Sequence, residues 1–139
     1  MDVYQILLQD HHAIHQIFLE INRANISEVR RREQLFRTLQ NQLGAHQILE
    51  ETIFYPEIDK YPDARDLIGM AFDEHAEFDA ILQEISEIPA DKLEWLERIS
   101  ELRDLVQQYV YSEENKMLSL SGQDRFAKCS CGGSRARVA

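Results

Sequence analysis

The stretch GAHQILEETIFYP, from Gly44 to Pro56, decides how this chain folds, because it places ionisable side chains on an apolar helix face. Leu43, His46, Glu50 and Ile53 recur at intervals of three and four residues, which is the period of an amphipathic α-helix. A carboxylate buried on such a face without a partner is strongly unfavourable. His46 and Glu50 therefore require partners from elsewhere in the chain.

The same period marks four helical segments in all. The first follows the N-terminus, and the second contains the stretch above and is interrupted near Pro56. Asp63 is a predicted cap of the third, and Asp91 with Glu94 forms a predicted capping box for the fourth. The stripe positions are Val3, Leu7, His11, Ile14, Phe18 and Ile21; Leu35, Leu39, Leu43, His46, Glu50 and Ile53; Ile68, Ala71, His75, Phe78, Leu82 and Ile85; and Ile99, Leu102, Val106, Tyr109, Glu113 and Met117. Short connections between such helices predict an all-α fold, an antiparallel up-down-up-down four-helix bundle.

Composition and charge limit the classes of partner. The length of 139 residues and the hydrophobic content of 44% suit one globular domain. The net charge of −10 disfavours nucleic acid or an anionic membrane as partner.

We expect the bundle to occupy residues 1–118. Residues 119–139 lose the helical period and carry four basic residues against one acid, which predicts a flexible basic C-terminal tail.

Targeting signals and cysteines add little to this picture. The sequence has no transmembrane run, and its N-terminus lacks the features of a signal peptide, so we expect a cytoplasmic protein. Cys129 and Cys131 lie in the predicted tail, where a soft-metal site or a thiol pair is the alternative to a simple flexible segment.

Polar side chains interrupt all four apolar stripes. They form two series with similar spacing, because His11 precedes His46 by 35 residues and His75 precedes Tyr109 by 34. In each series the later ring is followed four residues on by a carboxylate, which places the pair one turn apart on one helix face. Two antiparallel hairpins would bring the six groups to one level. Imidazole and carboxylate together are suitable ligands for iron, manganese or zinc. The six candidate ligands are His11, His46, Glu50, His75, Tyr109 and Glu113.

Four segments give the sequence a resemblance to a known family. LLQDHHAIHQIF, LGAHQILEETIFYP, FDEHAEFDAIL and YVYSEENKM resemble the ligand-bearing segments of the hemerythrin family, the HHE cation-binding domain. The resemblance implies a centre of two iron ions with histidine ligands, bridging carboxylates and an oxo or hydroxo bridge. It also implies an open position for dioxygen, peroxide or nitric oxide. The matching residues are His11, His46, Glu50, His75 and Glu113.

Tyr109 departs from the family pattern, which has a histidine at this position of the last helix. Tyr109 either ligates ferric iron as a phenolate or only packs, which would leave the second iron weakly held or absent. His15, one turn from His11, is a candidate replacement ligand. Asp79 is a candidate to orient His75 from outside the ligand set, and Tyr55 is a candidate hydrogen-bond donor or ligand.

Three functions remain open from the sequence. The first is a non-haem di-iron protein that binds or reacts with dioxygen, peroxide or nitric oxide, or senses iron or oxygen. The second is a peroxide-degrading di-iron enzyme. The third is a metal-poor helical module with an interaction or regulatory role, and its protein partner is unknown. A ferritin-like centre is disfavoured because the sequence contains no Glu-x-x-His motif.

Overall fold

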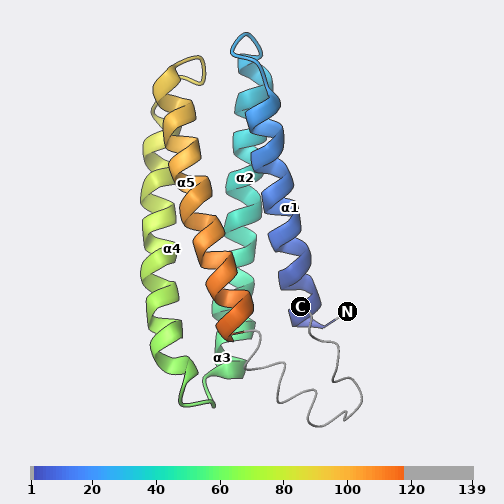
Figure 1. Cartoon of the computed structure of the whole chain (residues 1–139), viewed down its shortest axis with the longest axis vertical. Coiled ribbons are helices and arrows are strands. Elements are labelled where there is room, and N and C mark those ends of the chain that lie inside the picture. Colours follow the sequence, from blue (N-terminus) through green and yellow to red (C-terminus); the bar gives the residue numbers. More distant parts are fainter. Residues whose placement is uncertain (1, 118–139) are drawn as a thin grey trace.

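A computed structural model of the chain describes residues 2–117 and consists of long helices joined by short turns (Figure 1). The long helices are α1 (Val3–Arg23), α2 (Val29–Leu49), α4 (Ala64–Ser86) and α5 (Leu93–Ser112). No strand occurs among the residues that the structure describes. The prediction of an all-α bundle is confirmed. The predicted tail, with Cys129 and Cys131, lies outside the described residues.

The helices run up, down, up and down, and they form two hairpins (Figure 1). α1 packs chiefly against α2, and α4 packs against α5, while α5 also contacts α1. The turns between α1 and α2 and between α4 and α5 lie at one end of the bundle. The short helix α3 (Tyr55–Ile58) and the connection to α4 lie at the other end. No helix within residues 2–117 is long and apolar enough to cross a membrane.

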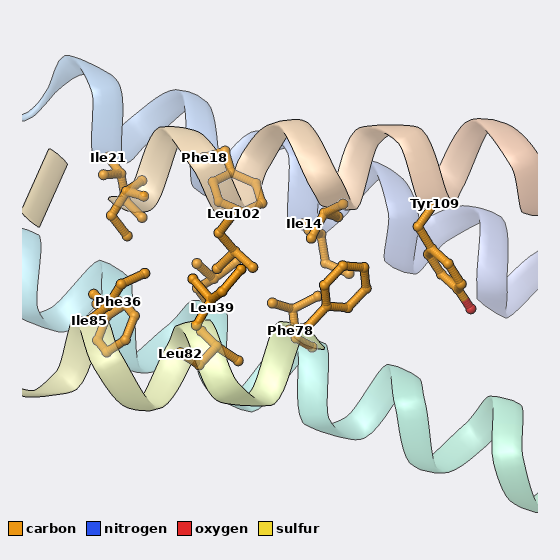
Figure 2. Packing of buried hydrophobic residues seen from close by; sticks show 14 of the residues in the cluster. Ile14, Phe18, Ile21, Phe36, Leu39, Phe78, Leu82, Ile85, Leu102 and Tyr109 are labelled. Atoms are coloured by element: carbon orange, nitrogen blue, oxygen red, sulfur yellow. The ribbon is translucent and has the colours of Figure 1, made fainter. Parts of the chain in front are cut away.

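Much of the apolar core fills the end of the bundle that carries the two hairpin turns. Ile21, Phe36, Ile85 and Leu102 come from the four long helices and lie between them in this part (Figure 2). Tyr109 lies farther along the bundle, with its hydroxyl turned into the interior. Ile58 of α3 is completely buried at the opposite end, so apolar packing continues there as well.

Two helices continue into π-helical segments. η1 (Glu50–Phe54) extends α2, and η2 (Glu113–Met117) extends α5. Pro56 has no backbone N–H and so donates no bond to Thr52, whereas the Tyr55 N–H reaches back five residues to the Glu50 carbonyl. The extra residue in this turn shifts the register of every later side chain.

The register shift corrects one sequence prediction. Ile53 was expected on the buried stripe at regular α-helical spacing, but its side chain is 50% exposed. Phe54 and Tyr55 are 0% and 2% exposed and take its place in the interior. Because the π turn inserts one residue after Glu50, Tyr55 faces the same side of the bundle as Glu50.

The predicted helix caps are only partly observed. Asp63 is the residue that precedes α4, as predicted, but its side chain makes no cap bond. α5 begins after Lys92, whose side chain makes no capping bond, rather than with the predicted capping box of Asp91 and Glu94. Neither helix therefore begins with a side-chain cap.

Candidate metal centre

The structure brings the six sequence-predicted candidates together inside the bundle. They come from all four long helices and the two π segments, and each is at most 6% exposed. The cluster occupies the end of the bundle opposite the two hairpin turns. Its members are His11 of α1, His46 of α2, Glu50 of η1, His75 of α4, Tyr109 of α5 and Glu113 of η2.

One half of the cluster is formed by two imidazoles and two carboxylates. His11 Nε2 lies 2.8 Å from Glu113 Oε1, and His46 Nε2 lies 3.0 Å from Glu50 Oε2. Ligand atoms of all four residues lie within 4.8 Å of one another. We call this set of four residues the first half of the centre.

The four ligand atoms of the first half are close together without forming regular hydrogen bonds. His11 Nε2, His46 Nε2, Glu50 Oε2 and Glu113 Oε1 are all buried and have no hydrogen-bond partner among the described residues. Unsatisfied buried polar atoms are costly, and four that converge on one point require a common partner. A cation at that point satisfies all four, so this half of the centre fits a metal ion.

Carboxylates outside the first half orient its imidazoles. Glu114 Oε2 lies 2.7 Å from Nδ1 of His11, and Asp10 Oδ2 lies 3.0 Å from Nδ1 of His46. Gln42 donates a hydrogen bond to the other oxygen of Asp10 at 3.1 Å. A proton held on Nδ1 leaves the Nε2 lone pair free for a metal.

The other half of the cluster contains one imidazole and two phenols. Nε2 of His75 lies 3.0 Å from Glu50 Oε1 and 3.1 Å from the Tyr109 hydroxyl. The Tyr55 hydroxyl lies 2.6 Å from that of Tyr109, and Glu51 Oε2 lies 2.8 Å from Nδ1 of His75. We call His75, Tyr109 and Tyr55, with the carboxylate oxygens that they contact, the second half.

Glu50 and Glu113 belong to both halves. Oε2 of Glu50 faces His46, whereas its Oε1 lies 2.6 Å from the Tyr109 hydroxyl. Oε1 of Glu113 faces His11, whereas its Oε2 lies 2.7 Å from the same hydroxyl. Each carboxylate therefore links the halves through its two oxygens.

Burial and hydrogen bonding set the protonation of the cluster in the absence of a metal. Burial and the neighbouring Glu50 carboxylate raise the pKa of Glu113 to about 7. Burial would also raise the pKa of Glu50, but its contacts with Glu113, His46 and His75 outweigh it and hold that pKa below its ordinary value. Burial would lower the pKa of His11, but its contacts with the carboxylates of Glu113 and Glu114 raise it to about 9. Protons on these groups occupy the positions that a cation would take.

Of the three additional candidates, only Tyr55 lies in the cluster. His15 is exposed on α1, and Asp79 is exposed on α4. Within the described part of the chain, neither residue makes a hydrogen bond to a member of the cluster, and Glu51 holds the position beside His75 that Asp79 was expected to fill. At these two positions the side chain lies on the exposed side of its helix and not beside the imidazole.

Three carboxylates that contact the imidazoles stand outside the six predicted ligands: Asp10, Glu51 and Glu114. Each of these acids immediately adjoins a cluster residue in the sequence. Each then contacts an imidazole on a different helix rather than on its own. The sequence shows each of these acids directly beside a predicted ligand, as DH at 10–11 and as EE at 50–51 and 113–114. The imidazole that each acid contacts depends on how the helices pack.

A groove between α1 and α5 leads to the centre from outside. It has a volume of about 420 Å³ and is lined partly by apolar side chains. His11 and Glu114 lie in its wall, so the groove reaches the first half of the centre. The apolar residues that line it include Leu8, Ile14 and Phe18 of α1 and Val106 and Val110 of α5.

Comparison with known proteins gives a family match and a distant relative. Residues 2–121 match the family profile described as the hemerythrin HHE cation binding domain. The chain is also 24% identical over 119 residues to a protein named DNA nickase from Nostoc sp.. The alignment covers 86% of this chain but 33% of that protein, so the chain spans about a third of the length of this relative. No solved structure matches the chain.

Proposed function

Because the chain belongs to the hemerythrin HHE cation-binding domain family, we propose that its bundle binds non-haem iron and that the iron binds or reacts with dioxygen, peroxide or nitric oxide. The observation that carries this proposal is the set of four unpaired ligand atoms in the first half of the centre. Both the imidazoles and the carboxylates in this half suit iron.

The charge of the first half also supports the binding of a divalent cation. Glu50 and Glu113 are 0% and 1% exposed, and two carboxylates at that depth need positive charge close by. Protonated imidazoles supply it in the metal-free protein. A divalent cation would supply it directly and leave the imidazoles neutral, with Nδ1–H groups donating to Glu114 and Asp10.

Bound iron would supply one-electron redox chemistry and a coordination position for a small ligand. The chain supplies a route by which this ligand reaches the centre. The groove between α1 and α5 admits a molecule of a few atoms, and its apolar wall favours uncharged ligands such as dioxygen and nitric oxide. Glu114, whose side chain is 40% exposed, lines this groove and contacts Nδ1 of His11.

Iron loading followed by optical spectroscopy tests the proposal. Protein reconstituted with Fe(II) without oxygen and then desalted should retain iron, and a His46→Ala variant should retain much less. Addition of nitric oxide or air should change the near-ultraviolet and visible spectrum of the loaded wild type. Wild-type protein that keeps no more iron than His46→Ala would overturn the proposal. Retained iron with no response to either gas would restrict the function to iron binding.

The residues that orient the imidazoles provide a second prediction. Asp10→Asn keeps the shape of the side chain but removes the charge beside Nδ1 of His46, so we expect the affinity for Fe(II) to fall by roughly 10-fold. Competition with a chromogenic Fe(II) chelator measures this. Asp79→Asn is the matched control, because Asp79 is exposed and should leave the affinity unchanged. Equal effects of the two substitutions would contradict the assigned role of Asp10.

A further inference from the structure

The two halves of the centre differ in how their polar atoms are satisfied. In the first half, four buried ligand atoms have no hydrogen-bond partner among residues 2–117. In the second half, the hydroxyl of Tyr109 lies 2.6 Å from Glu50 Oε1, 2.7 Å from Glu113 Oε2 and 3.1 Å from His75 Nε2. Tyr55 adds a fourth neighbour at 2.6 Å. One half thus lacks a partner that the other half already has.

The short contacts of Tyr109 have the length of hydrogen bonds to carboxylates. Oxygen–oxygen distances of about 2.5–2.7 Å are typical when a hydroxyl donates to a carboxylate. The Tyr109 hydroxyl lies in this range of both Glu50 and Glu113, but it has one proton and donates to one of them at a time. The Tyr55 hydroxyl supplies the second proton, because it contacts Tyr109 and also reaches Glu50 Oε1 at 3.3 Å. The oxygens that would serve a second cation are therefore already satisfied by phenol groups.

The buried charge leads to the same conclusion. Glu50 and Glu113 are the two carboxylates of the cluster that are almost fully buried. By contrast, the side chain of the outer acid Glu51 is 35% exposed. One divalent cation in the first half balances both buried charges. A second cation would have to share these two carboxylates and would gain only one imidazole, that of His75, because the two neutral phenols are weak ligands for a divalent cation.

We infer that the centre is unsymmetrical: it holds one cation tightly between His11, His46, Glu50 and Glu113, and the hydroxyl pair of Tyr109 and Tyr55 takes the place of a second cation. This inference rests on the proposed function, because it concerns the same iron. Tyr109 then acts as a positioning residue that holds the outer oxygens of both carboxylates and thereby aims their inner oxygens at the cation.

Metal stoichiometry tests this inference directly. Wild-type protein titrated with Fe(II) without oxygen and then desalted should retain one iron per chain, and Tyr109→Phe should also retain one. Tyr109→His replaces the hydroxyl donor with a second imidazole in that half, so it should retain two. Tyr111→His is the matched control, because Tyr111 lies on the same helix with 71% exposure, and it should retain one.

The optical spectrum of the oxidised protein gives an independent readout. If Tyr109 keeps its proton and does not ligate, the ferric wild type should show no visible tyrosinate–iron band. Two irons in the wild type, such a band that disappears in Tyr109→Phe, or a single iron in well-folded Tyr109→His would each overturn the inference. Wild-type protein that retains no iron would instead overturn the proposed function, so the two failures are distinguishable. If Tyr109→His does not fold, the wild type and Tyr109→Phe still decide the question.

Discussion

Replacing Glu50 with Gln is expected to abolish iron retention, with a larger loss of affinity than any substitution outside the cluster produces. Glu50 is completely buried, its Oε2 faces the first half, and its Oε1 accepts from Tyr109. Glutamine preserves the volume but removes a negative charge and replaces one ligand oxygen with an NH₂ group, which cannot bind a cation. Loss of an imidazole-orienting partner costs about 10–100-fold in affinity, so we expect at least about 100-fold here.

Two measurements check the Glu50→Gln prediction. Chelator competition gives the affinity for Fe(II), and thermal unfolding with and without Fe(II) gives the stabilisation that arises from binding. The melting temperature of the wild type should rise when Fe(II) is added, whereas that of Glu50→Gln should not. Glu33→Gln, an exposed position on α2, is the control and should behave as the wild type. A variant that still binds Fe(II) within tenfold of the wild type would show that Glu50 is not a ligand.

Replacing Trp95 with Ala is expected to give the largest loss of folding stability. Trp95 is 2% exposed and packs edge to face on Phe36, with ring centroids 6.2 Å apart. The buried guanidinium of Arg32 lies over its ring at 5.7 Å and donates to the carbonyls of Ala90 and Ala24. Removal of a buried tryptophan costs about 3–5 kcal/mol, which lowers the melting temperature of a domain of this size by roughly 10–20 °C.

The Trp95 substitution also tests whether the two ends of the bundle are independent. Trp95 precedes Glu113 by 18 residues, which at ~1.5 Å per residue places them about 27 Å apart along the helix. At a temperature where the variant is folded, it should therefore retain as much iron as the wild type. Leu93→Ala is the control, because Leu93 is 68% exposed and should change the unfolding free energy little. Equal destabilisation by both substitutions would contradict the packing assigned to Trp95.

The sequence was sufficient to predict the bundle and the six members of the cluster, because both depend on helical periodicity. His46 and Glu50 lie four residues apart on an apolar stripe, and so do Tyr109 and Glu113. That spacing holds in the structure because the helices are regular up to each carboxylate. The prediction of the hemerythrin family is confirmed over residues 2–121.

Periodicity fails beyond Glu50, where the assumption of a regular α-helix is wrong. Ile53 was predicted to be buried, but the π turn places Phe54 and Tyr55 inside instead. Spacing also could not assign each imidazole its partner, because Asp10 of α1 contacts His46 of α2, and Glu51 of η1 contacts His75 of α4. Such contacts depend on helix rotation and depth, which no spacing within one segment specifies.

The two π turns affect how this chain should be aligned with its relatives. Glu50 and Glu113 are each the first residue of a π segment, so the extra residue in each case follows the carboxylate. An alignment to a relative with regular α-helices that matches Glu50 and then continues without a gap would pair every later residue, Glu113 included, with the wrong structural equivalent. A one-residue gap after each acid would restore the match. Without it, Tyr55 would be compared with a position that points away from the interior.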